Sequence, residues 1–210
     1  MWAAGASGLD IAEATIVHDA DGRAGLLVRR CDRVTAADGS SAALAQEDGC
    51  QVLGRYPADK YNLESESVAR GLVAVTRAQP VAARQLLAQF VFAYLTGNGD
   101  AHAKNFSVGR TPDGEWRLTP AYDVVSTHPY GDHTLALGVN GKRGEDLGRV
   151  DFLAFAEAVG LRERAATRTI TDLVDRTERW LPRLGELPFD GHRIHRLVRA
   201  VEDRRRRLRQ

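Results

Sequence analysis

Asp100, Asn105 and Asp123 are the side chains of this sequence whose types and spacing best suit chemistry on a phosphate. Transfer of a phosphoryl group from a nucleotide needs a carboxylate at the acceptor hydroxyl and oxygen ligands for magnesium. Both are needed because the transition state is stabilised mainly by position and charge. Two carboxylates and an amide match those needs.

The elements around these residues must bring them together. An apolar stripe at helical spacing over residues 86–95 ends at a Gly-Asn-Gly breaker, so a buried helix delivers the loop 100–105. Two strand-like runs, 106–108 and 116–118, flank the turn signal Thr-Pro-Asp-Gly and predict a hairpin. Asp123 follows the hairpin.

The same order occurs in protein kinases, where four residues separate the catalytic Asp from a metal-binding Asn and a second metal-binding Asp follows a hairpin. The segments GNGDAHAKNFSV and RLTPAYDVVS closely resemble the D-x-H-x-K-N-F-S and L-x-P-x-Y-D-x-x-S blocks of the HipA-like serine/threonine kinases. These are the toxin kinases of bacterial toxin-antitoxin pairs. The resemblance implies that Asp100 is the catalytic base and that Asn105 and Asp123 are the magnesium ligands.

The resemblance also implies a site for ATP. The segment GLLVRRCDRV is similar to the family's strand and hinge, where backbone groups hold adenine. Arg29 stands where the family often has an acidic residue, and Cys31 where it often has an aromatic one. The residues that the resemblance assigns to the nucleotide are Arg29, Arg30, Cys31, His102, Lys104 and Tyr122.

Other interpretations of the same residues stay open. Asp100 and Asn105 could merely cap turns after Gly99, and Asp123 could be an ordinary residue at a strand end. The run Gly99 to His102 also suggests a metallophosphoesterase, although that chemistry normally needs several further His and Asn ligands.

The fold class expected from the resemblance is α+β and protein-kinase-like, with a mostly helical C-lobe and a few hinge-side strands of a truncated N-lobe. Residues 1–35 would be the remnant of the nucleotide-lobe strands and hinge. Residues 36–210 would form the helical lobe, with the catalytic loop at 97–106 and the metal-binding segment at 120–126.

Sequence patterns predict the remaining elements. A hairpin pairs residues 15–18 with 24–30, and Pro80 suits the first turn of the buried helix. The other predictions are a short helix from Gln46 to Gly54, helices at 64–79, 151–159 and 162–181, a strand at 134–139, and a last helix from about 188 to the C-terminus.

Composition limits the function classes. The chain has 210 residues, with 43% hydrophobic and 27% charged, which is ordinary for one soluble globular domain. The net charge of +1 gives no overall field to attract nucleic acid, so no direct nucleic-acid binding is expected. Cys31 and Cys50 are too few for a disulfide framework, and no signal peptide or transmembrane run is evident. We expect a cytoplasmic protein with no membrane association.

Several charged and histidine residues receive structural interpretations. Glu47, Asp48 and Lys60 are expected to be surface charges, with an ion pair across the loop as the alternative. His128 and His133 are expected to be loop histidines, because no further ligand stands at metal spacing. His192 and His195 would lie on a solvated helix face, and the arginine run 204–207 would form a solvated tail.

The parts of a kinase that grip the phosphates are not evident before Asp100. No G-x-G-x-x-G occurs there, and Lys60, the only lysine in the first 103 residues, follows the hinge and so cannot be the strand lysine. The resemblance covers roughly the C-terminal half of a family member and lacks the family's regulatory serine. The alternative to a kinase is therefore a catalytically inactive HipA-like module that binds an antitoxin or complements a second chain.

The family resemblance also implies partners. These are a protein substrate, in known cases an aminoacyl-tRNA synthetase, and a DNA-binding antitoxin. A second chain that supplies the missing N-lobe strands is a further expected partner.

Overall fold

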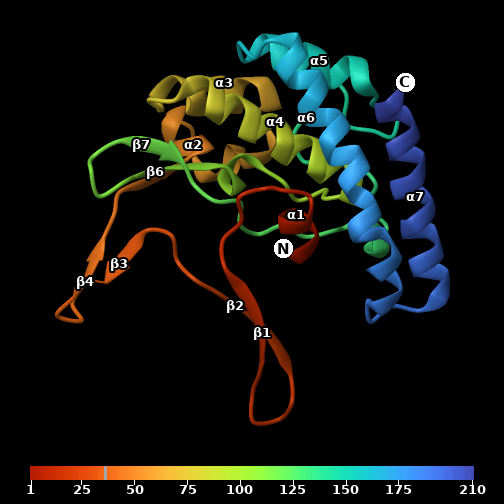
Figure 1. Ribbon diagram of the computed structural model, residues 1–210, viewed down its shortest axis with the longest axis horizontal. Coiled ribbons are helices and arrows are strands. Elements are labelled where there is room, and N and C mark those ends of the chain that lie inside the picture. The colour runs from red at the N-terminus through yellow and green to blue at the C-terminus, as the bar shows by residue number, and fades with distance from the viewer. Residues whose placement is uncertain (36) are drawn as a thin grey trace.

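The computed structural model describes residues 1–35 and 37–210; Ala36, where the larger predicted domain begins, lies outside them. The long helices gather into one body, and small sheets and hairpins lie along one side of it (Figure 1). The helices of the body are α3 (Ser65–Val75), α4 (Gln79–Thr96), α5 (Arg149–Ala158), α6 (Glu163–Arg176) and α7 (Gly191–Arg209).

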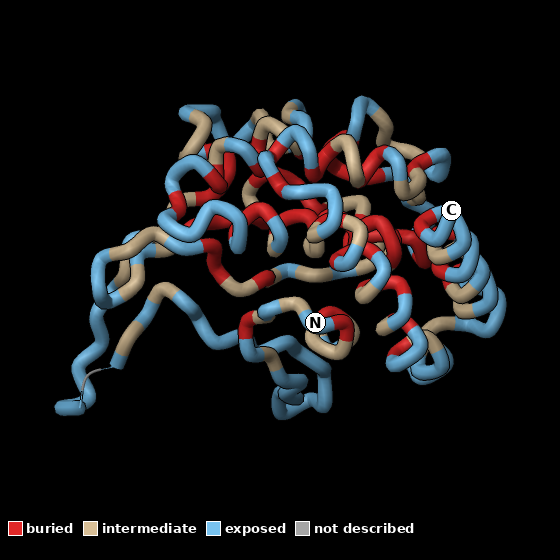
Figure 2. The backbone as a smooth tube through the Cα atoms, turned by 45° about the horizontal axis from the view of Figure 1, so that its top comes forward, coloured by how far each residue is buried: buried red, intermediate tan, exposed pale blue. Residues whose placement is uncertain are grey.

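Helix α4 is the centre of this body. It packs against α3, α5, α6 and α7, and the six consecutive residues 90–95 are all buried, so every face of the helix is covered there. Figure 2 shows the buried residues gathered in the interior of the helical body. A helix that is apolar all round belongs in a core. Pro80 lies in its first turn as predicted, and Gly97 ends it in the left-handed conformation with φ 67°. None of the described helices is both long and apolar enough to cross a membrane.

The strands form three small antiparallel sheets. The predicted hairpins are confirmed: the first is β1 (Ala14–His18) with β2 (Ala24–Val28), and the second is β6 (Ser107–Arg110) with β7 (Trp116–Leu118). The second hairpin pairs through β6 with β5 (Gln46–Asp48), while β3 (Arg33–Thr35) pairs with β4 (Ser41–Ala43). Both β1–β2 and β3–β4 extend away from the helical body (Figure 1).

Short helices connect these elements. The α-helical ones are α1 (Trp2–Ala6) and α2 (Gly49–Val52). The 3-10 helices are η1 (Pro57–Tyr61), η2 (Ala103–Asn105), η3 (His128–Tyr130), η4 (Thr177–Arg179) and η5 (Leu181–Glu186).

Two predicted elements are wrong. Gln46 does not begin a helix, because residues 46–48 pair with β6 and α2 begins at Gly49. The capping box between Asp48 and Gln51, with two hydrogen bonds of 3.0 Å, fixes that start. Residues 134–139 form no strand; they make only isolated bridges at Gly138 and Val139. Their apolar side chains are all buried, so this extended segment fills the core.

Two predicted helices are shorter than expected. The helix expected at 64–79 ends at Val75, because Thr76 is extended. The helix expected at 162–181 ends at Arg176 and continues only as 3-10 turns around Trp180. Trp180 is 1% exposed and donates its indole N–H to Ser7 Oγ at 2.7 Å, so a tertiary contact overrides helical spacing here.

The arginine run at the C-terminus is not a solvated tail. Arg204 is 4% exposed and donates to the backbone oxygens of Tyr94 and His133, at 3.0 and 3.3 Å. Arg205 is also largely covered and pairs with Glu178 at 3.0 Å. The helical spacing of Leu197, Val201, Arg204 and Leu208 directs one face of α7 into the core.

Candidate active site

The predicted catalytic loop begins where α4 ends. After Gly97 the side chain of Asn98 accepts a hydrogen bond from the backbone N–H of Asp100 at 3.1 Å. The hydroxyl of Thr127 accepts another from the backbone N–H of Gly99 at 2.8 Å. A local side chain and one from a later loop therefore both fix the backbone that carries Asp100.

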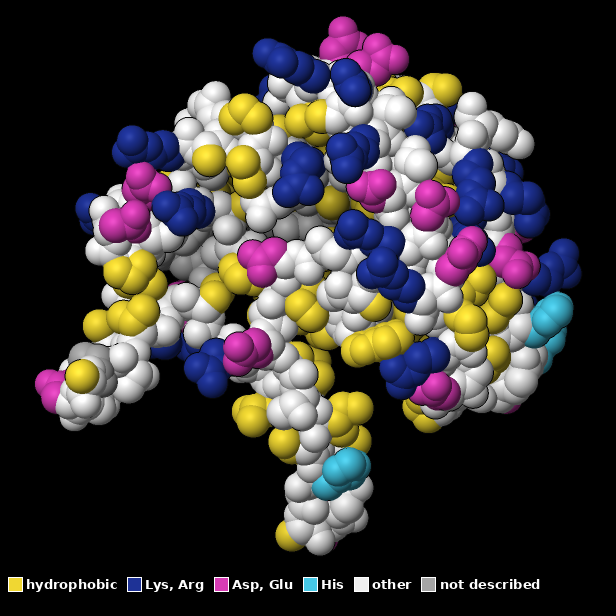
Figure 3. Space-filling model, viewed as in Figure 1, with side chains coloured by type: hydrophobic (Ala, Val, Ile, Leu, Met, Phe, Trp, Pro, Cys, Tyr) yellow, Lys and Arg dark blue, Asp and Glu magenta, His cyan; other side chains and the backbone are white. Residues whose placement is uncertain are grey.

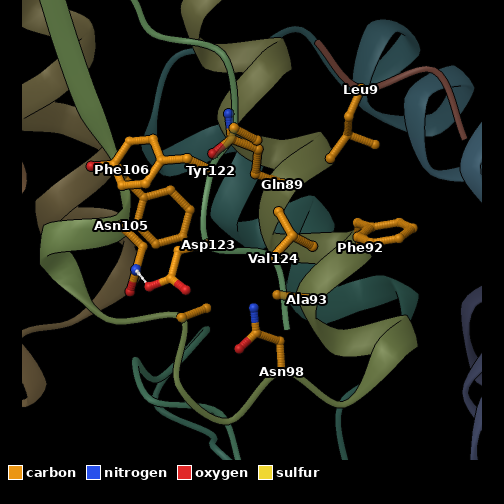
Figure 4. A pocket seen from close by; sticks show the side chains of 12 residues that line it. Leu9, Gln89, Phe92, Ala93, Asn98, Asn105, Phe106, Tyr122, Asp123 and Val124 are labelled. Atoms are coloured by element: carbon orange, nitrogen blue, oxygen red, sulfur yellow. Dashed lines mark hydrogen bonds between the residues drawn. The ribbon is translucent and has the colours of Figure 1, made fainter. Parts of the chain in front are cut away.

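The two predicted magnesium ligands meet. Asn105 Nδ2 donates to Asp123 Oδ2 at 2.7 Å, across 18 residues of sequence (Figure 4). The Asn105 side-chain oxygen accepts from the backbone N–H of His102 at 2.9 Å and keeps a second lone pair. Asp123 has φ 54°, a left-handed conformation that is uncommon outside glycine. The surrounding structure thus holds Asp123 in a strained position beside Asn105.

Asp100 has a partner that sequence reasoning missed. Tyr61, at the end of η1, donates its hydroxyl to Asp100 Oδ1 at 2.6 Å. This hydrogen bond raises the pKa of Tyr61. It occupies one oxygen of the carboxylate and leaves the other oxygen for a further hydroxyl. Nothing in the local sequence connects positions 61 and 100.

His102 lies between the candidate base and the candidate cation site. Burial lowers its pKa first, and the nearby charge of Lys60 lowers it further, while Asp100 and Asp123 both oppose the shift. Lys60 Nζ lies 2.9 Å from His102 Nε2, so that nitrogen accepts and the ring proton lies on Nδ1. The backbone N–H of His102 also donates to the side-chain oxygen of Asn105 at 2.9 Å, so His102 connects the loop of Asp100 to a predicted cation ligand.

The expected surface charges are partly wrong. Lys60 contacts His102 and is half-buried. Asp48 is 9% exposed and accepts a charge-assisted hydrogen bond of 2.7 Å from Lys104, so the ion-pair alternative holds for Asp48, with Lys104 as partner. The pair raises the pKa of Lys104. The ammonium of Lys104 is therefore held by β5, and its predicted role toward the nucleotide stays a prediction.

The predicted hinge and Tyr122 line one open pocket of about 220 Å³. Arg29, Arg30 and Cys31 line this pocket together with Tyr122, which belongs to the predicted metal-binding segment. The Tyr122 hydroxyl donates to the backbone oxygen of Lys104 at 2.7 Å, and burial raises its pKa to about 12.

Tyr122 also lines a second, narrow cavity of about 20 Å³ with Asn105 and Asp123 (Figure 4). The hinge pocket and the cavity beside the predicted cation ligands therefore share Tyr122 as a lining residue. The structure therefore places the predicted adenine side and the predicted metal side of the site next to each other.

His128, predicted to be a loop histidine, lies in the 3-10 helix η3 and is buried. Its side chain is 5% exposed, and burial, with His133 and Arg204 as further causes, lowers its pKa to about 4. Within the described residues, the three-residue group that could hold a metal is His128, His133 and Glu145. Asp100 and His102 belong to no such group in that part of the chain, which argues against the metallophosphoesterase interpretation. His192 and His195 are exposed on α7 as expected.

The fold is a protein-kinase-like α+β fold. It superposes over 99% of the chain on HipA in the Shewanella oneidensis MR-1 complex of HipA, HipB and operator DNA, with a TM-score of 0.80 and 25% identity, covering 53% of that HipA chain. It also superposes over 99% of the chain on the Helicobacter pylori proinflammatory kinase CtkA, with a TM-score of 0.66, 13% identity and 80% coverage of that chain. The second likeness shows the fold alone. The predicted fold class is confirmed.

Residues 1–181 match the HipA-like C-terminal domain family, and the chain belongs to that family. It is 33% identical to the putative kinase Y4mE of Sinorhizobium fredii, over all of this chain and 52% of that protein. It is 31% identical to the serine/threonine-protein kinase toxin HipA of Shewanella oneidensis, over 80% of this chain and 43% of that protein. The chain spans about half the length of these relatives, whose names place it in a kinase-like class.

Proposed function

We propose that this chain is the catalytic lobe of a HipA-type serine/threonine protein kinase, which transfers the γ-phosphoryl group of magnesium-ATP to a protein hydroxyl. The observation that carries the proposal is the 2.7 Å hydrogen bond between Asn105 and Asp123. It joins two oxygen-bearing side chains that a kinase uses for its cation. The proposed boundary between nucleotide-lobe strands and helical lobe lies near residue 35.

The residues at the site fit a magnesium ion. Carboxylate and amide oxygens suit this hard cation, and Asp123 is exposed, so its Oδ1 can reach a cation that also carries water and phosphate ligands. When bound, the cation neutralises charge on the nucleotide phosphates. Asn105 and Asp123 would hold this cation, and Asp100 would orient the acceptor hydroxyl and take its proton. Lys60, beside His102, adds a positive charge near the loop.

The proposed nucleotide position follows from the two pockets. Adenine would occupy the hinge pocket, against the backbone of residues 29–31, and the phosphates would pass Tyr122 toward Asp123. His102 and Lys104 would line the loop side of this path.

Calorimetric titration of the whole chain with magnesium-ATP tests this proposal. We expect one binding site, loss of binding in Asp123→Ala and Asn105→Ala, and unchanged binding in Asp113→Ala, an exposed carboxylate in the β6–β7 turn. Equal heats in the wild type and Asp123→Ala would contradict the proposed cation ligands. Absence of any heat would contradict nucleotide binding by this chain.

The proposed partners follow from the family. HipA of Shewanella oneidensis occurs in a complex with HipB and its operator DNA, so we propose a DNA-binding antitoxin for this chain as well. The proposed substrate is a protein hydroxyl, and an aminoacyl-tRNA synthetase is the first protein to test. Co-purification with the products of neighbouring genes would identify the antitoxin, and phosphoproteomics after expression would identify the substrate.

A second candidate function is a catalytically inactive module that complements another chain. The β1–β2 hairpin favours it, because Ile16, Leu26 and Leu27 are 67%, 58% and 59% exposed and apolar side chains gather on this projecting element (Figure 3). An added strand or domain would cover them. A partner that binds Asp100→Asn as well as the wild type, with no phosphoryl transfer by the wild-type complex, would establish this second function.

A further inference from the structure

The loop that follows Asp123 brings together three potential metal ligands. His128 lies in η3, His133 lies five residues further, and Glu145 comes from the segment before α5. One ligand atom from each residue lies within 4.8 Å of the others. The two imidazole rings lie 4.2 Å apart between centroids and are inclined at 71°. None of these residues belongs to the proposed phosphoryl-transfer site.

Among the residues that the structure describes, the polar atoms of these three side chains lack hydrogen-bond or ion-pair partners. The Nδ1 atoms of His128 and His133 are both buried without a hydrogen-bond partner. A buried nitrogen without a hydrogen-bond partner lowers the stability of the fold, so each such group needs an explanation. Within the described part of the chain, Glu145 makes no ion pair and no side-chain hydrogen bond. Two imidazole nitrogens and one carboxylate therefore lie close together, and no described side chain forms a hydrogen bond or ion pair with them.

We propose that His128, His133 and Glu145 bind a divalent transition-metal cation, with zinc preferred. Two imidazoles and one carboxylate, with water in the fourth position, are a common tetrahedral zinc environment. Zinc bonds of about 2.0–2.2 Å place neighbouring ligand atoms roughly 3.4 Å apart. The present separations of up to 4.8 Å are longer than this, so zinc binding requires the side chains to rotate inward, above all the exposed Glu145.

The positive charge of Arg204 makes the carboxylate of Glu145 essential for cation binding at this site. Its guanidinium donates to the backbone oxygen of His133 and lies over the ring of Tyr94. This fixed positive charge opposes a cation at the two histidines. The carboxylate of Glu145 must offset it, so Glu145 contributes charge compensation as well as a ligand atom. Removing only the charge of Glu145 should therefore weaken metal binding as strongly as removing a histidine.

A metal at this position would stabilise the loop that contacts the start of the predicted catalytic loop. The backbone N–H groups of Thr127 and His128 both donate to the carbonyl oxygen of Gly97, which ends α4 just before Asp100. The loop that carries both histidines therefore already contacts the turn that positions the candidate base. A bound cation would tie this loop to the segment that carries Glu145 and raise the unfolding temperature of the chain.

Zinc titration of the untagged, chelator-stripped chain tests the proposal, with competition against a chromogenic chelator as readout. We expect one equivalent to bind and the unfolding temperature to rise. His128→Ala and Glu145→Gln should each lower the affinity by at least about tenfold. Glu145 is exposed, so its isosteric replacement leaves folding intact even if His128→Ala disturbs the buried loop.

Two control variants separate this site from others. His192→Ala/His195→Ala removes an exposed pair one turn apart on α7 and should leave zinc binding unchanged. Asp123→Asn should also leave it unchanged, which distinguishes the site from the proposed magnesium ligands. The proposal is overturned if the wild type binds no zinc at micromolar concentrations. It is equally overturned if Glu145→Gln binds zinc as tightly as the wild type while the α7 double variant loses it.

Discussion

Tyr61 donates a 2.6 Å hydrogen bond to the carboxylate of Asp100, although 39 residues separate them in sequence. The 3-10 helix η1 packs against η2 and so delivers an aromatic hydroxyl onto the candidate base. A carboxylate with one oxygen held in this way has a fixed orientation toward whatever hydroxyl the other oxygen meets.

Replacing Tyr61 by Phe tests the value of that orientation. We expect phosphoryl transfer to fall by about tenfold, since a misplaced base loses part of its general-base contribution. Magnesium-ATP affinity should not change, because Asn105 and Asp123 keep their contact. Radiolabelled transfer measured beside calorimetry checks both parts. A Tyr61→Phe variant with full transfer activity would show that Asp100 needs no such partner.

Substitutions of Asp123 can separate its effect on folding stability from its effect on magnesium-ATP binding. Asp123→Asn should fold as stably as the wild type, because Asn tolerates the left-handed backbone and can still accept from Asn105. It should nevertheless lose magnesium-ATP binding. Asp123→Val should be less stable than Asp123→Asn by roughly 1–2 kcal/mol, since a β-branched residue at φ 54° is strained.

Urea unfolding of the two variants measures the stability difference, and calorimetry measures binding. Equal stability of the Asn and Val variants would mean that the backbone at position 123 relaxes on substitution.

Burial lowers the pKa of His102, and the neighbouring charge of Lys60 lowers it further. The Nζ to Nε2 distance is 2.9 Å, and the charge of Lys60 lowers the pKa of the ring. Lys60→Met should therefore raise the pKa of His102 toward its ordinary value, although burial still holds it below that value. An NMR titration of the imidazole resonances measures the change. Lys142→Met, at the Asp151 ion pair, serves as control and should leave the pKa of His102 unmoved.

His128 should make the metal-free chain sensitive to mild acid. Its pKa is lowered from 6.5 to about 4, so the unfolded chain binds more protons between these values. Stability is therefore complete above pH 6.5 and falls by roughly 2–3 kcal/mol as the pH drops toward 4. His133, Arg204 and Arg196 add to the burial effect, and Glu145 opposes it.

Urea unfolding at several pH values, with a chelator present, measures this dependence. His128→Phe should remove most of it, because the ring volume stays and the titrating nitrogen goes. The exposed variant His192→Phe should keep it. If His128→Phe follows the wild-type curve, the acid sensitivity arises from other groups.

Local patterns predicted the elements that carry the candidate site. The apolar spacing of residues 86–95, the glycine breaker after them and the turn signal at 111–114 depend on backbone chemistry that neighbours in sequence determine. The meeting of Asn105 and Asp123 also followed from their spacing around a hairpin. These predictions succeeded because each needed only one short segment and one known spacing.

The missed features depend on contacts between distant segments. Lys60 and Tyr61 reach the catalytic loop only because η1 packs on η2, and an arginine run gives no sign that Arg204 is buried under Tyr94. Residues 134–139 have a strand-like composition, but within the described part of the chain they pair with other backbone only at isolated positions. Glu145 lies 12 residues after His133, too far for a spacing rule to group it with the histidines.

The bridge between Ile11 and Ala121 connects the projecting hairpin to the candidate cation ligands. The backbone of Ala121 donates to Asp10 and accepts from Ala12, both at 2.9 Å, two residues before Asp123. These two backbone hydrogen bonds join the segment that leads into the outer hairpin to the segment that carries Asp123. A displacement of the hairpin would therefore shift the backbone beside this candidate cation ligand.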